Sequence, residues 1–269
     1  HTNGSIKSLV PYQDGAIDGM FKGYHPDGQL HRIGRYRSNS PMGTHSFFDE
    51  SGRRQGESFI DENGNGHWRS WHHSGKPHED GQYAEGQQND LWKVSGITGI
   101  PKTETTYLAG VPYGRYRTFY VTGEVNVEGS YLDGRREGLI TYFYMNGRVG
   151  LTAEFTGGRL NGAWKRYHYD AQPKEYGFFK DGRRFGEWTF FYDNGKTMSR
   201  GKYERGARTG TWKYWWASGD FWKDVLFVDG VEQSSAPLQC ELVEGEWSFD
   251  GKQREMGCQI CQPKKAQEQ

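Results

Sequence analysis

The stretch DGRRFGEWTFFYDNG, residues 181–195, decides the fold of this chain. The pairs Asp181-Gly182 and Asn194-Gly195 tolerate the positive φ angles that tight β-turns require. Between these pairs, residues 188–192 (WTFFY) are rich in the aromatic residues that favour β-strands. The stretch therefore predicts half of a β-hairpin, and the question is whether this hairpin stands alone or repeats.

The same pattern recurs along the whole chain with a period of about 24 residues. Steps of this size from the glycine before the tryptophan in GEW give Gly186, Gly210, Gly162, Gly138, Gly114, Asp90, Gly66, Gly43 and Gly19. An aromatic residue also lies three positions before each turn of the DG type, at Tyr12, Tyr36, Phe59, Tyr83, Tyr107, Tyr131, Phe155, Phe179, Tyr203 and Phe227. The hairpin is therefore the repeating unit of the molecule.

This period predicts an all-β protein, built as an elongated, curved antiparallel meander of about nine 24-residue β-hairpin repeats. We expect the repeat array to span residues 12–230, with an N-terminal extension at residues 1–11. A C-terminal cap with the cysteines follows at residues 231–262, and a disordered tail at residues 263–269. Trp188 and Phe191 are three residues apart, so either both sheet faces carry rings or β-bulges bend the strands. We expect bulges in many repeats.

The composition excludes several classes of function. Aromatic residues make up 16% of the chain and hydrophobic residues only 33%, so the tryptophan column is more simply the core than an exposed surface that stacks sugars or lipid. Lys plus Arg and Asp plus Glu are each 34, which argues against a nucleic-acid partner. There is no G-x-S-x-G or H-E-x-x-H motif, so we expect no enzyme activity and no cofactor.

The segment GEWTFFYDNGKTMSRGKYERGARTGTW, residues 186–212, resembles the bacterial MORN-variant repeat of toxin–antitoxin antitoxins of the YwqK type. The resemblance covers about residues 12–230 and implies a MORN-like hairpin array that binds a partner. Several bacterial members of this family act as antitoxins or immunity proteins, with lipases and phospholipases among their targets. Eukaryotic MORN proteins are associated instead with membranes, phosphoinositides and scaffolding. No motif residue of the family is catalytic.

The resemblance thus implies a non-catalytic protein-binding module, an immunity protein or antitoxin that neutralises a bacterial toxin or secreted effector enzyme. The alternative is a membrane- or phosphoinositide-associated scaffold, which the neutral charge disfavours. The chain begins at His1 without Met, so we expect a processed or truncated form, with membrane contact only through any anchor that has been removed. The expected location is periplasmic or otherwise extracytoplasmic, with a cytoplasmic antitoxin as the alternative.

Departures from the repeat indicate where a partner binds. Residues 93–106 replace an aromatic run, residues 169–177 carry Pro173 in place of the turn glycine, and residues 41–66 are irregular and acidic. The alternatives are a drifted repeat with a surface loop and, for the acidic residues, solvated turns. The partner-binding candidates are Asp49, Glu50, Asp61, Glu62, Lys93, Lys102, Glu104, Tyr169, Lys174 and Glu175.

Two further clusters contain residue types that ligate metals or form disulfides. His67, His72, His73 and His78 lie close in sequence, but alternation along a strand separates His72 from His73, so we expect no metal site. All three cysteines follow the last repeat, and a disulfide from Cys240 to Cys258 or Cys261 would pin the cap and place the protein outside the cytoplasm. Reduced thiols are the alternative.

Overall fold

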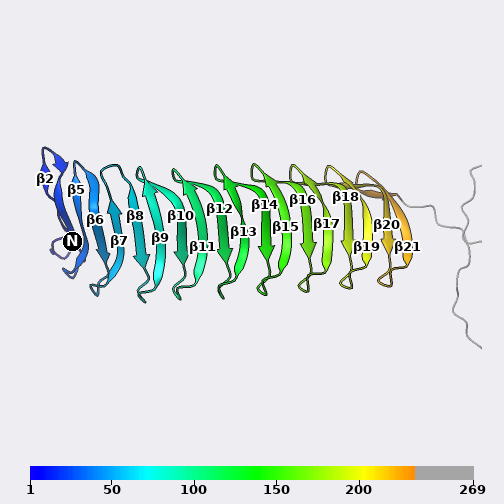
Figure 1. The fold of residues 1–269 in the computed structure, drawn as a ribbon, viewed down its shortest axis with the longest axis horizontal. Helices are drawn as coiled ribbons and strands as arrows, with labels where there is room; N and C mark the ends of the chain where they lie inside the picture. Colours follow the sequence, from blue (N-terminus) through cyan, green and yellow to red (C-terminus); the bar gives the residue numbers. More distant parts are fainter. Residues whose placement is uncertain (234–269) are drawn as a thin grey trace, which may run out of the picture.

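The computed structural model describes residues 1–233, which form one long antiparallel sheet without helices (Figure 1). Strand β1 pairs with β4, and every strand from β4 to β22 pairs with the next one along the chain. The sheet has 20 strands, and a separate two-stranded ribbon joins β2 to β3. The predicted elongated hairpin meander is confirmed.

The strands of the N-terminal half begin with three short ones and then settle into longer pairs. Their bounds are β1 (Ser8–Leu9), β2 (Tyr12–Gln13), β3 (Ala16–Ile17), β4 (Gly19–Tyr24), β5 (Leu30–Arg37), β6 (Ser40–Phe48), β7 (Arg54–Ile60), β8 (Gly66–Trp71), β9 (Pro77–Ala84), β10 (Gln87–Ser95) and β11 (Pro101–Leu108).

The strands of the C-terminal half are more uniform, and all but the last have eight or nine residues. Their bounds are β12 (Val111–Phe119), β13 (Val125–Leu132), β14 (Arg135–Phe143), β15 (Val149–Thr156), β16 (Arg159–Tyr167), β17 (Pro173–Lys180), β18 (Arg183–Phe191), β19 (Thr197–Glu204), β20 (Ala207–Trp215), β21 (Phe221–Val228) and β22 (Val231–Gln233).

Two turn types alternate between the two edges of the sheet, except that β7 and β8 are joined by a turn of the longer type. At one edge, Asp181 (φ 51°) and Gly182 (φ 78°) form a two-residue turn whose positive φ angles match the twist of the paired strands. At the other edge, the Tyr192 amide donates to the Lys196 carbonyl at 2.8 Å, and the Gly195 amide (φ 78°) donates back to the Tyr192 carbonyl at 2.9 Å. The turn pairs read from the sequence therefore set the hairpin at both ends.

β-Bulges interrupt the ladder at regular places, as expected. In the β17–β18 pair, Phe178 faces Phe185 while Tyr176 faces Thr189, so residues 186–188 together oppose Gly177. Rings nevertheless pack on both faces. Trp188 stacks on Phe190 at a centroid distance of 5.9 Å, whereas Phe191 packs against Tyr176 at 5.2 Å on the opposite face. Both sequence-level alternatives, bulged strands and two aromatic faces, are therefore present.

The tryptophan column forms the core. Trp188 and Trp212 have 0% exposed surface, and they cluster with Tyr203, Val225 and Phe227. These two indoles also donate their N–H groups to backbone carbonyls, Trp188 to Phe178 and Trp212 to Lys202, each at 3.1 Å. The expectation that this column is core is confirmed for the C-terminal repeats.

A second column of small residues makes this packing possible. Gly177 faces Trp164 across the β16–β17 ladder, and the indole of Trp188 from β18 lies directly over it. Gly201 holds the same place beneath Trp212. A Cβ atom on either glycine would overlap the indole, so these strand glycines are required for space and not for turns.

Hydrogen bonds between neighbouring turns add a further link from repeat to repeat. The Tyr192 hydroxyl donates to the Trp215 carbonyl at 2.9 Å, and Tyr144 donates to the Tyr167 carbonyl at 2.7 Å. His25 and His72 place a ring nitrogen at the corresponding carbonyls of Phe48 and Ser95. Each of these bonds joins residues 23 positions apart, which fixes one turn against the next.

Two departures that the sequence suggested are smaller in the structure. Residues 93–106 form an ordinary hairpin, in which the Gly96 amide donates to the Ile100 carbonyl at 2.7 Å across a turn of the usual length. The alternative of an added surface loop there is therefore wrong, and partner contact by these residues stays a prediction. The placement of Pro173 at the turn-glycine position is also wrong: Pro173 begins β17, Ala171 occupies the turn-glycine position with a φ of 74°, and the His168 amide still donates to the Gln172 carbonyl.

In one N-terminal repeat a histidine, His45, takes the place of the tryptophan. His45 is only 3% exposed, packs edge-on against Tyr36 at 5.2 Å and covers Gly34 as Trp92 covers Gly81. Burial lowers the pKa of His45 below its ordinary value of 6.5, although the Arg35 carbonyl, 2.9 Å from Nε2, acts in the opposite direction. The neutral imidazole is therefore the form that the fold favours.

We expect Gly177→Ala to lower the free energy of unfolding by about 1–3 kcal/mol, because the new methyl group forces the Trp188 indole out of its place. Gly96→Ala is the matched control, since its Cβ meets only ordinary contacts and its φ is not positive. Urea unfolding followed by tryptophan fluorescence measures both. Equal midpoints for the two variants would contradict the assigned packing.

We expect His45→Trp to reduce the loss of stability in acid. The folded-state pKa of His45 is lowered, so below about pH 6.5 the unfolded chain takes up a proton that the folded chain resists. This costs at most about 1.4 kcal/mol per pH unit for one group, and it vanishes above pH 6.5. Unfolding midpoints at pH 8 and pH 5 test it, with His67→Gln at a partly exposed histidine as the control. An unchanged pH dependence in His45→Trp would overturn the prediction.

Candidate functional site

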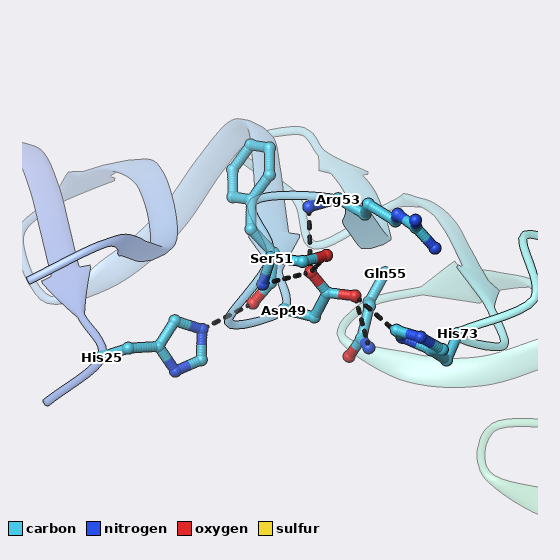
Figure 2. A network of polar contacts seen from close by, with 7 residues as sticks. His25, Asp49, Ser51, Arg53, Gln55 and His73 are labelled. Carbon is cyan, nitrogen blue, oxygen red and sulfur yellow. Dashed lines mark hydrogen bonds and ion pairs between the residues drawn. The ribbon is translucent and has the colours of Figure 1, made fainter. Parts of the chain in front are cut away.

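Asp49 lies at the centre of a polar network on the edge with the longer turns (Figure 2). Its Oδ1 accepts hydrogen bonds from the Ser51 hydroxyl at 2.6 Å and from the amides of Ser51 and Arg53, each at 2.9 Å. Its Oδ2 lies 3.2 Å from Nδ1 of His73 in the next repeat. The Ser51 hydrogen bond, together with the two amides and His73, lowers the pKa of Asp49 well below its ordinary range.

This network is a turn support that also links two repeats. Asp49 stands where His25 and His72 stand in the neighbouring repeats, and its amide donates to the Arg53 carbonyl as theirs do in their own turns. Ser51 and His73 both contact the carboxylate of Asp49, so the hydroxyl is not paired with an imidazole base as a Ser-His-Asp arrangement requires. The contacts of this network stabilise two neighbouring turns.

The other acidic candidates lie at separate places along the sheet. Asp61 accepts from the amides of Asn63 and Asn65 in a turn on the opposite edge from Asp49. Glu62 makes only a long 3.9 Å contact with Arg37, and Glu50 is exposed. These carboxylates therefore do not form one acidic patch, and a role in partner binding stays a prediction.

The remaining candidates also lie on different hairpins. Lys93 and Glu104 are directly opposite each other in the β10–β11 ladder, and Lys102 is exposed nearby on β11. Tyr169 is exposed in the turn before β17 and packs on Tyr144 at 5.2 Å, and Lys174 follows on β17. The structure thus places Lys93, Lys102 and Glu104 on one hairpin and Tyr169 with Lys174 on another.

Glu175 differs from the other candidates because it is only 7% exposed. Its Oε1 accepts the indole N–H of Trp164 at 3.0 Å, and its Oε2 lies 3.2 Å from the Arg184 guanidinium. Arg184 in turn covers the Trp188 ring, 4.3 Å from its centroid. These contacts tie Glu175 to the core, and contact with a partner stays a prediction.

Across residues 1–233, no three His, Cys, Asp or Glu side chains converge as metal ligands would. The rings of His72 and His78 are 4.4 Å apart, but His72 is committed to the Ser95 carbonyl. Of the predicted cap, residues 231–233 form β22, while the predicted disulfide of Cys240 with Cys258 or Cys261, the rest of the cap and the tail lie outside the described residues. No helix in the described part of the chain is long and apolar enough to cross a membrane.

The sequence reasoning missed an aromatic surface on the β17–β18 hairpin. Phe178 and Phe185 are partners across the ladder and are 54% and 45% exposed. They line a hollow of about 440 Å³ next to a second one of about 590 Å³, and the two share Phe185 and Lys180. The signal was available: these two aromatic residues lie off the columns that build the core.

Comparison with known proteins supports the repeat assignment. The family model described as the MORN repeat variant matches residues 17–38 and 186–205. No curated protein matches the chain. Among solved structures, one match is a chain of the crystal structure of TcdB2-TccC3-Cdc42, at 10% identity and a TM-score of 0.19, covering 82% of this chain and 14% of that one. This chain therefore spans only a small part of that structure's length. Two of its hairpins carry the sequence of the MORN repeat variant.

We expect Ala171→Gly to stabilise the protein by about 0.5–1 kcal/mol, because Ala171 has a φ of 74° that glycine adopts more easily. Gly147→Ala at the equivalent turn, where φ is 76° and a Cβ meets nothing within 4 Å, should destabilise it by a similar amount. Thermal unfolding by circular dichroism measures both. Shifts in the same direction would contradict the shared turn geometry.

Proposed function

We propose that this chain is a non-catalytic protein-binding module that neutralises a bacterial toxin or secreted effector enzyme. Its long sheet would cover the active site of that enzyme and deny it substrate. The proposal extends the match to the MORN repeat variant with the function implied by the resemblance to antitoxins and immunity proteins.

The observation that carries the proposal is a single-layer sheet whose fold depends on a limited set of side chains. Trp, Gly and turn residues build the hairpins, while several other strand positions face solvent and make no core contact. Several of these positions nevertheless hold large apolar side chains, which do not improve solubility and are typical of a surface that binds another protein. Exposed examples on the strands are Leu108, Tyr113, Leu132, Leu139, Phe178 and Phe185.

We place the site of action in the periplasm or elsewhere outside the cytoplasm. The support is chemical: three cysteines follow the repeats in a chain that otherwise has none. A disulfide among them would persist only in an oxidising compartment. Thiol labelling of the protein isolated from its native cells, with and without prior reduction, would show which form they take.

Affinity purification of the tagged chain from its native cells, followed by mass spectrometry, tests the function. We expect one enzyme to co-purify in a fixed molar ratio. Adding the purified chain to that enzyme should abolish its turnover at one equivalent, and co-expression should restore the growth of cells that produce it. An enzyme that stays fully active in the complex, or a chain that floats with liposomes and binds no protein, would refute the proposal.

A further inference from the structure

We propose that the outer face of the β17–β18 hairpin, near the Asp181-Gly182 turn, binds an acidic protein segment that seats an apolar side chain against Phe178 and Phe185. The inference rests on the proposed function and identifies the chemistry of the partner's contact. We call this surface, formed by Phe178, Lys180, Arg183 and Phe185, the β17–β18 patch.

The register places all four side chains of the patch on one face. Phe178 pairs with Phe185 and Lys180 pairs with Arg183, while Phe179 and its partner Arg184 point to the tryptophan face between them. The ammonium of Lys180 lies 5.4 Å from the Phe185 ring centroid. An apolar centre is thus bordered by cations, the arrangement typical of an interface anchor with a charged rim.

The charges around the patch are unbalanced. The hollow beside it is lined by the cations Arg159, Lys180, Arg183, Arg184 and Arg205 and by the anions Asp181 and Glu204. Arg184 is committed to Glu175, but the other four cations make no ion pair with any residue in the range 1–233. Complementarity therefore calls for carboxylates on the partner.

The fold does not require these residues. The positions equivalent to Phe178 and Phe185 hold Ser130 and Glu137 on the β13–β14 hairpin, and Lys202 and Thr209 on the β19–β20 hairpin. Those hairpins have the same strand lengths and the same bulge. Since polar residues are compatible with the same geometry, two exposed phenylalanines at this place are not explained by folding.

A membrane surface fits the patch less well than a protein segment does. A bilayer is flat and would meet many hairpins at once, but on the two adjacent hairpins the positions equivalent to Phe178 and Phe185 hold Glu154 with Asn161 and Lys202 with Thr209, which are polar. Asp133 and Asp181 recur in the turns of the same edge and would repel anionic lipids. One apolar pair with a few cations suits a single short chain segment.

Two peptides of equal length test the chemistry directly on the full chain. One alternates Glu with Phe, the other alternates Lys with Phe, and both carry fluorescein for anisotropy measurements in 0.15 M salt. We expect the acidic peptide alone to bind, and its affinity to fall with added salt. Equal binding of both peptides, or binding of neither, would overturn the proposal.

Substitutions locate the binding. We expect the double variant Phe178→Ser with Phe185→Ser to weaken binding of the acidic peptide at least tenfold, and Lys180→Ser with Arg183→Ser to do the same. The matched control is Lys202→Ser with Thr209→Ser, which alters the same positions one repeat later and should bind as the parent does. Circular dichroism melting checks that each variant is folded. A tenfold loss in the control as well would overturn the assignment to this patch.

Two further measurements separate this inference from the proposed function. If the phenylalanine variant binds and inhibits the co-purified enzyme as well as the parent chain does, the binding role of the β17–β18 patch is refuted while the proposed function stands. If no enzyme binds at all, the proposed function fails whatever the peptides do. If vesicles containing phosphatidylserine bind the parent chain but not the phenylalanine variant, the ligand of the patch is a lipid surface, and the proposed protein segment is wrong.

Discussion

The packing of one tryptophan over the glycine of the preceding strand is the contact on which the rest of the structure depends. A single-layer sheet has no second layer to cover its rings, so burial has to come from the adjacent hairpin. Trp188 over Gly177 and Trp212 over Gly201 achieve this, and both indoles are fully buried. The guanidinium groups of Arg184 and Arg208 lie over the same rings at 4.3 and 4.5 Å and close the open side.

The bulges and turns follow from this contact. The bulge at Gly186 sets Trp188 opposite the backbone of Gly177, and the tight turn at residues 181–182 brings the two strands together. Since the same elements return in each repeat, the stability of the array is close to a sum of neighbouring terms. His45 shows what the contact tolerates: a smaller, titratable ring is accepted at the same place, with its neutral form favoured.

Much of the fold was predictable because its signals are local. Turn pairs, strand residues and the period are all visible in a single repeat, and they gave the hairpin, the meander and the bulges. The spacing glycines such as Gly177 were not recognised, because their role depends on which residue lies across the ladder, and the bulges shift that register. Pro173 was wrongly assigned to the turn-glycine position, because Ala171, two residues earlier, can adopt the positive φ that the turn requires.

The candidate surface was harder to predict. A residue that departs from the repeat can be there to make an internal contact or to contact a partner, and the sequence does not distinguish the two. Asp49 and Glu175 looked like free acidic groups, but the structure shows both making internal hydrogen bonds. Phe178 and Phe185 looked like ordinary strand residues in an aromatic-rich chain, and only the alternation of side chains reveals that they face outward. Exposure, and not composition, separates residues that hold the fold from residues left available to a partner.

Within residues 1–233, the side-chain contacts between turns join only successive repeats, as from Tyr192 to Trp215 and from His25 to Phe48, so the array has no fixed length built into it. A duplication or loss of one whole unit in the gene would leave every surviving pair of neighbours intact. The molecule can therefore lengthen or shorten in the course of evolution while the chemistry of a single hairpin stays unchanged. A change in the number of repeats would alter the distance between two hairpins that contact a target, without altering the affinity of either hairpin for it.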